Sequence, residues 1–224
     1  MRLVKPSFAI EFFPKDVCVD LELIGRTCYK SENVVTGKSA GPFVRKLVRM
    51  GHWSVIEHAT ATVKFVVDRG VSHELVRHRL ASYSQESTRY CDYKGGVCFV
   101  IPTWCSWIEE GVYGHVSELR KMYSRSGGGG TCEESVFIWL DLLLRIEEGY
   151  RSLRSLKISP QTARGILPNS LKTEIVMTAN FREWFHVFNL RCSMAAHPQM
   201  REIMIPLREE FSRRCPEVFE VKDS

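Results

Sequence analysis

The sequence predicts an α+β fold, in which a central and mostly antiparallel sheet is flanked by helices within a single domain of residues 1–224. Two segments, 59–68 and 171–179, have the residue pattern of strands, whereas several longer segments have the pattern of helices. These segments do not follow the regular strand–helix alternation of a doubly wound sheet. The sequence contains no Gly-x-Gly-x-x-Gly motif, so it does not support a Rossmann nucleotide site.

The first half of the chain contains one clear strand with a helix on either side of it. Pro42 stands in the first turn of a segment with apolar residues at helical spacing, which predicts a short helix over residues 41–48. Every second residue of segment 59–68 is apolar, so we expect a strand with one buried face. Gly70 is expected to end this strand, and a helix to follow from about Ser72. One face of that helix would carry three side chains that are three and four residues apart: Glu74, Arg77 and His78.

Helix-start patterns divide the second half of the chain, on both sides of the strand at 171–179. A hydroxyl or amide residue followed three residues later by glutamate is typical of a capping box, and proline favours the first helical turn. Three capping boxes predict helix starts: Ser106 with Glu109, for a helix toward Arg125; Thr131 with Glu134, for a helix through about Lys157; and Asn180 with Glu183. Two prolines predict the other starts: Ser159–Pro160, for a helix that carries Arg164 and stops near Leu167, and His197–Pro198, for a last helix that Pro206 would kink. The four glycines at 127–130 predict a flexible surface loop, without the lysine of a phosphate-binding P-loop.

Composition and charge narrow the function only a little. The 224 residues carry a net charge of +5 and an isoelectric point near 8.8, which suits an anionic small molecule or a nucleic acid. The sequence has no run of 18 apolar residues and no apolar signal-peptide core, so we expect a cytoplasmic protein without a membrane partner. The eight cysteines include no Cys-x-x-Cys pair, so we expect free, buried thiols and no metal site.

Residues 77–90 give the strongest indication of a binding site. The triplet Arg77-His78-Arg79 is followed by serines, a glutamine and a threonine, and then by Arg89. Arginine presents a planar fork that matches a phosphate or a carboxylate, and a buried charge without a partner is costly. A basic triplet alone would be interpreted as a solvated helix end. The hydroxyl- and amide-rich residues that follow it favour a loop that recognises an anion.

Three further groups are candidates for the same site. They are Arg164 before Leu167-Pro168; Asn180, Arg182, His186, Asn189 and Arg191; and, more weakly, residues 52–58 with His52 and His58. Arg164 and Arg182, taken alone, would be exposed helix charges. Arg191 lies in the apolar run 188–192 and needs an anion or an acceptor there, so a binding role and a structural role are equally supported. Ser87 has no Gly-x-Ser-x-Gly elbow and is interpreted as a ligand-binding hydroxyl rather than a nucleophile.

Arg77-His78-Arg79, with Ser87 following after seven residues, resembles the signature of the flavin-dependent thymidylate synthases. The match continues as Ser-x-Arg-Tyr at 87–90. Further similar motifs span most of the chain in the same order: Gly25-Arg26 with Cys28, Gly51-His52 to Glu57-His58, Ala163-Arg164 to Leu167-Pro168, Asn180 to Arg182, and Asn189-Leu190-Arg191.

The resemblance implies a homotetramer that binds FAD and dUMP between its subunits. NADPH would reduce the flavin, methylenetetrahydrofolate would supply the carbon as cosubstrate, and dTMP would be the product. We expect neither a metal nor a nucleic-acid partner. The flavin carries the chemistry in such enzymes, while the protein supplies position and electrostatics, which agrees with the lack of an evident nucleophile.

The resemblance also assigns roles to individual residues. Arg191 would be catalytic, by polarising the uracil ring and favouring its ionisation at N3. The flavin would be bound by Ser54, Arg77, His78, Arg79, Gln85, Asn180, Arg182 and His186. The substrate would be bound by Glu74, Leu75, Val76, Arg77, Gln85, Glu86, Ser87, Thr88, Arg89, Arg164 and Arg191. The chain departs from the family's pattern at three places, where it has Glu74 for glutamine, Ser84-Gln85 for an asparagine-led pair, and His186 for asparagine.

Two other functions are compatible with the sequence. A basic nucleic-acid-binding module without catalysis is allowed by the net charge, and it predicts an affinity that falls steeply with salt. The scattered basic residues and the lack of an aromatic–basic platform argue against it. A flavoprotein that acts on a nucleotide other than dUMP is the second possibility, and a comparison of nucleotides as substrates separates it from the thymidylate synthase.

Overall fold

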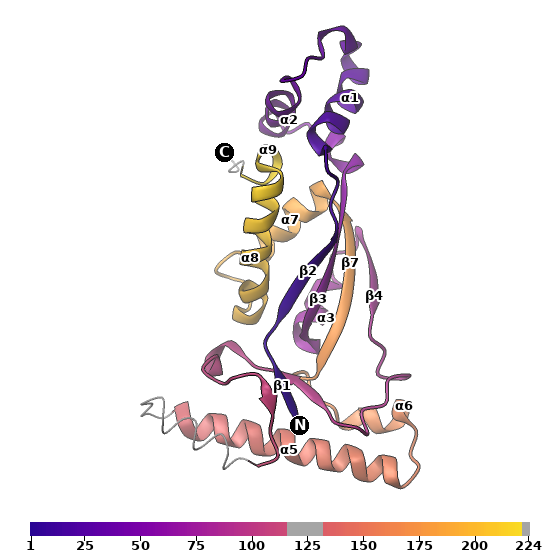
Figure 1. Ribbon diagram of the computed structural model, residues 1–224, viewed down its shortest axis with the longest axis vertical. Helices are drawn as coiled ribbons and strands as arrows, with labels where there is room; N and C mark the ends of the chain where they lie inside the picture. The colour runs from indigo at the N-terminus through magenta and orange to yellow at the C-terminus, as the bar shows by residue number, and fades with distance from the viewer. Residues whose placement is uncertain (116–131, 221–224) are drawn as a thin grey trace. The chain divides into compact units, whose positions relative to one another are not determined.

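The computed structural model describes residues 1–115 and 132–220, and it divides the chain into two compact units (Figure 1). The first unit consists of residues 1–7, 66–73 and 85–175, and the second of residues 8–65, 74–84 and 176–224. Each unit is therefore assembled from segments that lie far apart in the sequence. The predicted glycine loop at 127–130 lies outside the described residues, and the single domain expected from the sequence stays a prediction.

The first unit is built on a small sheet and one long helix. Strand β1 (Arg2–Val4) is the middle strand; it pairs in parallel with β5 (Cys98–Val100) and antiparallel with β6 (Gly111–Val112). The long helix α5 (Cys132–Ser155) is followed by the short helix α6 (Pro160–Ala163). Single turns of 3₁₀ helix occur at η3 (Thr103–Cys105) and η4 (Arg164–Ile166).

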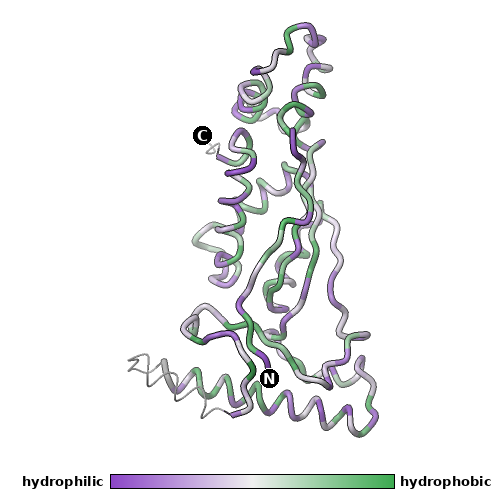
Figure 2. Tube along the Cα trace, in the orientation of Figure 1, coloured by the Kyte–Doolittle hydropathy of each residue, from purple (hydrophilic) through white to green (hydrophobic). Residues whose placement is uncertain are grey.

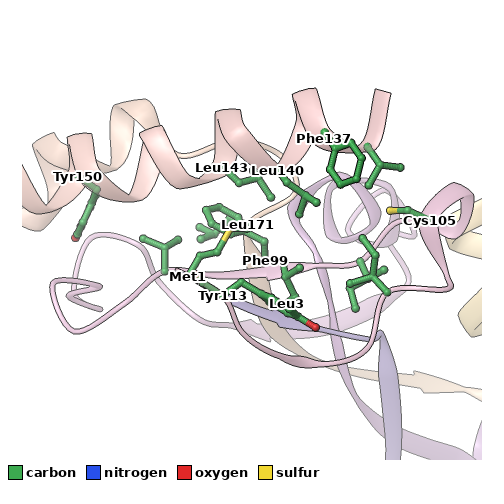
Figure 3. Packing of buried hydrophobic residues seen from close by; sticks show 14 of the residues in the cluster. Met1, Leu3, Phe99, Cys105, Tyr113, Phe137, Leu140, Leu143, Tyr150 and Leu171 are labelled. Atoms are coloured by element: carbon green, nitrogen blue, oxygen red, sulfur yellow. Dashed lines mark hydrogen bonds between the residues drawn. The ribbon is translucent and has the colours of Figure 1, made fainter. Parts of the chain in front are cut away.

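Helix α5 covers the core of the first unit with one of its faces. Leu140 and Leu143 are buried together with Phe99 of β5 and Leu171, as Figure 3 shows. On the other face Arg145 forms an exposed ion pair with the aspartate one turn earlier. Figure 2 shows the resulting alternation of hydrophilic and hydrophobic residues along the helix, which is the pattern of a helix packed on one side.

The second sheet has the strand order β2-β3-β7-β4. Its strands are β2 (Ser7–Phe12), β3 (Thr60–Asp68), β7 (Lys172–Asn180) and β4 (Ala81–Gln85). Strands β3 and β7 run antiparallel: the hydroxyls of Thr62 and Thr178 are 2.9 Å apart, while just beyond the other end of β3 the amide of Arg69 donates to the carbonyl of Leu171. Buried and partly exposed residues alternate along both strands, as expected from the sequence.

Five whole α-helices and two 3₁₀ turns of the described residues belong to the second unit. The last two residues of a further helix, α3 (Arg69–Leu75), also belong to it. The whole helices and the turns are α1 (Val17–Tyr29), η1 (Glu32–Val34), α2 (Ala40–Arg49), η2 (Val55–His58), α7 (Phe181–Arg191), α8 (Pro198–Arg214) and α9 (Pro216–Phe219). Their shared core is aromatic. Phe211 of α8 packs against Trp184 and Phe188 of α7 and Phe219 of α9, with ring centroids 5.1 to 5.2 Å apart. The large buried area of these rings makes them the main source of stability in this unit.

Several predicted elements are confirmed. Helix α2 contains Pro42 in its first turn, and both predicted strands are present as β3 and β7. Asn180 caps α7, because its side-chain oxygen accepts a hydrogen bond of 2.8 Å from the amide of Glu183. The helix predicted at Ser159–Pro160 is shorter than expected: it ends at Ala163, and Arg164 begins the 3₁₀ turn η4. Helix α8 starts at Pro198 as expected, but α9 follows it, so α8 is not the last helix.

Two predicted elements are wrong. The capping box at Ser106 does not open a helix over residues 106–115, which contain turns and β6 instead. The remainder of that predicted helix lies outside the described residues. Helix α3 (Arg69–Leu75) starts before Ser72, because the Asp68 carboxylate accepts a 2.7 Å hydrogen bond from the amide of Val71. It therefore ends before Arg77 and His78, which do not share a helix face with Glu74.

Seven of the cysteines are free thiols, as expected from the sequence. Only Cys105 and Cys215 among these seven are fully buried, whereas Cys28 is exposed and the other four are partly buried, so the expected burial is wrong for most of them. None of the helices in the described residues is long and apolar enough to cross a membrane.

Candidate active site

The arginine–histidine–arginine triplet lies in a tight turn between α3 and β4. The turn begins where the amide of His78 donates to the carbonyl of Leu75. The hydroxyl of Tyr83, on β4, lies 2.7 Å from the Leu75 carbonyl and 2.9 Å from the His78 carbonyl. One phenol therefore joins both ends of the turn, and burial raises the pKa of Tyr83 to about 12. The phenol thus stays protonated at neutral pH and holds the shape of the turn.

Arg191, the last residue of α7, binds this turn through three hydrogen bonds. Its Nε donates to Nε2 of His78 at 2.9 Å, its Nη1 to the Glu74 carboxylate at 2.8 Å, and its Nη2 to the Glu74 carbonyl at 3.0 Å. A guanidinium has five N–H groups, so these bonds leave two for other acceptors. The structure thus brings together three of the predicted site residues, and it places a cation with spare donors among them.

His78 is a buried, neutral histidine. Burial is the main cause that lowers its pKa to about 4, and the charges of Arg191 and His186 add to the effect. Because Nε2 accepts from Arg191, the ring proton of the neutral form is assigned to Nδ1. Nδ1 faces the buried Glu183 carboxylate at 3.5 Å, and burial raises the pKa of that carboxyl. A chain of polar groups therefore runs from Glu183 through His78 to Arg191.

Most of the other residues at this turn are exposed. Arg77 and Arg79 point their side chains to the surface and have no ion pair within the described residues, and Val76 is also exposed. Leu75 is buried and contributes its carbonyl to the Tyr83 bond. Only the histidine of the triplet thus has a place in the interior, which leaves the two arginines available to an anion.

A cavity of about 430 Å³ lies in the second unit beside α7. Its lining residues are Glu57, Leu80, Asn180, Arg182, Glu183 and His186. Three of these were predicted to bind the flavin. Arg182 is exposed and forms an ion pair of 2.5 Å with Glu57, whose amide donates to the carbonyl of Ser54. Ser54 itself is exposed at the start of η2 and does not line the cavity.

The predicted residues of the first unit form a second group, in which Gln85 and Glu86 anchor the segment that follows β4. Gln85 Nε2 donates to the hydroxyls of Ser72 and Thr173, at 2.9 and 3.2 Å. The Glu86 carboxylate accepts from the Tyr93 hydroxyl at 2.8 Å and from Lys172 at 3.0 Å. Both polar side chains are thus used to hold the segment in place.

Ser87, Thr88 and Arg89 make the open part of the same group. Thr88 is buried and accepts a 3.2 Å hydrogen bond from Arg164 of η4. The Ser87 carbonyl accepts hydrogen bonds from the amides of Tyr90 and Cys91, which closes a turn. The Ser87 hydroxyl accepts a 3.3 Å hydrogen bond from the amide of Arg89. Arg89 is exposed. Arg164 reaches this segment from 76 residues further along the chain. Two arginines and two hydroxyls gathered in this way make a fitting receptor for a phosphate.

Three residues of these groups were not predicted as site residues. Tyr83 was taken as part of a loop, because β4 is short and polar. Glu183 was recognised as the partner of Asn180 in a capping box, but its burial was not evident from the sequence. Lys172, which also binds Glu174 at 2.7 Å, stands at the start of β7 and has no local signal of its role.

Comparison with known proteins identifies the family. The model of the family described as thymidylate synthase complementing protein matches residues 16–217. A flavin-dependent thymidylate synthase of Corynebacterium efficiens is 31% identical over 206 residues, which cover 89% of this chain and 77% of that protein. One from Mycolicibacterium vanbaalenii is 33% identical over 208 residues, with the same coverage.

Among solved structures, a UMP/dUMP methylase, PolB from Streptomyces cacaoi, bound with 5-Br dUMP, has a similar fold. The TM-score is 0.76 at 22% identity, over 98% of this chain and 96% of that one. The match of the family model over most of the chain, together with relatives above 30% identity, establishes the relationship. The resemblance carried by Arg77-His78-Arg79 and Ser87 is confirmed: this chain belongs to the flavin-dependent thymidylate synthase family.

Proposed function

We propose that this protein converts dUMP to dTMP, with FAD as cofactor, methylenetetrahydrofolate as carbon donor and NADPH as reductant. The observation that carries the proposal is the three-bond attachment of Arg191 to His78 and Glu74, in a chain that belongs to this family. This attachment holds a guanidinium with two unused N–H groups in a fixed orientation. A fixed donor of this kind is suited to stabilising charge that develops on a ring edge.

The residues of the second unit fit a flavin. Arg77 and Arg79 are exposed cations that can bind the pyrophosphate of FAD, and arginine is the side chain best suited to that role. The cavity beside α7 offers the amide of Asn180 and the ring of His186 next to an apolar leucine, which is the mixture typical of a cofactor site. FAD would supply the hydride and carbon chemistry when bound.

The residues of the first unit fit the phosphate of dUMP. Arg164 and Arg89 supply positive charge, and Ser87 and Thr88 supply hydroxyls. Glu86 and Gln85 keep the segment in place through Lys172 and the neighbouring hydroxyls. Arg191 would stabilise negative charge on the uracil ring, so that its C5 becomes electron-rich without a covalent bond to the protein. Ser87 would bind substrate and would not act as a nucleophile.

We further infer a homotetramer with sites shared between subunits. The exposed arginines of the triplet support this assembly, because a neighbouring subunit and the two ligands together would supply the partners that these charges lack among the described residues. Light scattering measures the mass directly. A tetramer is expected with bound FAD, and a monomer at micromolar concentration would contradict the inference.

The purified protein tests the enzymatic proposal in two steps. Reconstitution with excess FAD should give a flavin absorption spectrum that changes when dUMP is added. With NADPH and methylenetetrahydrofolate, dUMP should then be converted to dTMP. A preparation that binds no flavin would contradict the proposal, and one that binds flavin but prefers another nucleotide would support a different flavoprotein.

The nucleic-acid-binding alternative is tested on the same preparation. If the protein is a nucleic-acid-binding module, its affinity for a DNA or RNA oligonucleotide should fall steeply as salt is raised from low to physiological concentration. For the enzyme we expect no such affinity, and an oligonucleotide should not compete with dUMP for the FAD-loaded protein.

A further inference from the structure

Two cysteines and a glutamate meet in the second unit, away from every residue assigned to the active site. Cys18 Sγ of α1 lies 4.0 Å from Cys215 Sγ and 3.6 Å from Glu217 Oε2, and the three ligand atoms lie within 4.8 Å of one another. Cys215 is fully buried, and the other two are half-buried. The cluster joins the first helix of this unit to the two helices at its end, across 197 residues of sequence.

The spacing of these atoms is that of ligands around a tetrahedral ion. Zinc binds thiolate sulfur at about 2.3 Å and carboxylate oxygen at about 2.0–2.2 Å, so the edges of its tetrahedron are about 3.8 Å between two sulfurs and about 3.6 Å between sulfur and oxygen. Two of the three observed separations, 4.0 Å between the sulfurs and 3.6 Å between Cys18 Sγ and Glu217 Oε2, match these edges, and the third lies within 4.8 Å. A disulfide requires its sulfurs at about 2.05 Å, roughly half the observed separation.

The backbone around the cluster is already fixed. Cys215 stands between α8 and α9: its amide donates to the carbonyl of Phe211, and its carbonyl accepts from the amides of Val218 and Phe219. Gly41 of α2 leaves room for the Glu217 carboxylate, since a Cβ at that position would lie 3.1 Å from Oε1. Ligands that are held before the ion arrives lose little freedom on binding it.

Charge also balances at this place. Two thiolates and one carboxylate around a divalent ion leave a net charge of −1. Arg45 lies 3.7 Å from Oε1 of Glu217, on the side of the carboxylate away from the contact with Cys18, and supplies the compensating charge. Half-buried ligands leave one position open to solvent, which a water molecule would fill.

We infer that Cys18, Cys215 and Glu217 form a structural binding site for a thiophilic divalent cation, zinc above all, with water as fourth ligand. The ion would replace the two thiol protons and tie α1 to α9. This role is independent of the proposed thymidylate synthesis. Sequence spacing gave no indication of it, because the two cysteines belong to opposite ends of the chain and no Cys-x-x-Cys pair is present.

Zinc content after equilibrium dialysis of the FAD-loaded protein tests the site. The wild-type chain should retain one zinc ion more per subunit than Cys18→Ser. Glu217→Gln should bind zinc at least about 10-fold more weakly, which is the lower end of the loss expected even for an outer partner of a metal. Cys192→Ser is the matched control, because it removes a half-buried thiol outside the cluster and should keep the full zinc content.

X-ray absorption at the zinc edge gives a second measurement that does not depend on the folding of the variants. Two sulfur ligands at about 2.3 Å are expected in wild-type protein. The inference would be overturned by wild-type protein without retained zinc, by equal zinc in Cys18→Ser, or by a spectrum with oxygen and nitrogen ligands alone. A Cys18–Cys215 disulfide found by mass spectrometry of unreduced protein would also overturn it.

Discussion

Replacing Arg191 by alanine is the sharpest test of the active-site geometry. The change removes the three hydrogen bonds to His78 and Glu74 together with the positive charge. If Arg191 stabilises charge on the uracil ring, dTMP formation should fall by about 100- to 1,000-fold, as when one preorganised donor to a developing charge is lost. FAD binding should change less than about 10-fold, or about 1.4 kcal/mol.

The cost to stability follows from what the substitution leaves behind. His78 is 5% exposed and would have an unpaired buried acceptor, which costs about 1–3 kcal/mol. The Glu74 side chain is 36% exposed, so its ion pair with Arg191 is screened and contributes only about 0–1 kcal/mol. Together these losses are about 1–4 kcal/mol. For a chain of this length they should lower Tm by roughly 2–16 °C.

Three measurements on the same variant separate the possible roles. Steady-state dTMP formation and FAD titration give the two functional numbers, and calorimetry gives Tm. The pKa of His78, followed by NMR, should rise above its value of about 4 because the guanidinium charge is gone, while burial keeps it below the ordinary 6.5. Arg191→Lys keeps the charge but cannot reach three acceptors, so it should lie between wild type and alanine.

The reasoning is refuted by any of three results. Full activity in Arg191→Ala would show that the guanidinium has no role at the substrate. An equal loss of FAD binding and of dTMP formation would mean that Arg191 acts on the flavin through His78, not on uracil. A pKa of His78 that does not move would contradict the lowering of that pKa by the positive charge of Arg191.

Three further predictions rest on single contacts. Stability should fall as pH falls from about 6.5 to about 4, by up to about 3 kcal/mol, because in this range the unfolded chain binds a proton at His78 and the folded chain does not. In urea titrations over this pH range, wild type should show this slope and His78→Gln should lack it, whatever its stability at neutral pH. Asn180→Ala should cost about 1 kcal/mol of stability in the same titrations, through loss of the cap on α7, and an unchanged midpoint would contradict the capping role. Arg164→Ala should raise the KM for dUMP with little change in kcat, and Thr88→Val should do so more weakly; a fall in kcat alone would argue against phosphate binding.

Local patterns predicted the parts of the fold that local forces decide. The alternation in β3 and β7 and the asparagine cap of α7 depend on neighbours within a few residues, and these were predicted correctly. The helix expected at Ser106 failed because tertiary contacts override its capping box. Tyr113 instead donates its amide to the carbonyl of Met1 and its hydroxyl to the carbonyl of Glu109, and a helix would break both bonds.

Strand β4 shows the same limit at the active site. Its residues, Ala-Ser-Tyr-Ser-Gln, are small or polar and have no strand pattern of their own. They form a strand because β7 offers an edge to pair with. The partners of Arg191 were likewise out of reach, since Glu74 lies 117 residues away in the sequence. The family motif predicted which residues form the site, and only the fold could show that Glu183 and Tyr83 contact them.

The hydroxyl of Tyr83 holds the turn in shape, so the arginines of the triplet are not needed for that purpose. Because this hydroxyl and the backbone define the turn, the side chains of Arg77 and Arg79 contribute nothing to its shape. If the two arginines bind the pyrophosphate of FAD as proposed, substitutions at these positions should alter which anions are recognised while leaving the fold unchanged. The protein thus has a pair of positions at which natural variation or laboratory selection can explore new ligand preferences at little cost in stability, provided that Tyr83 and His78 are kept.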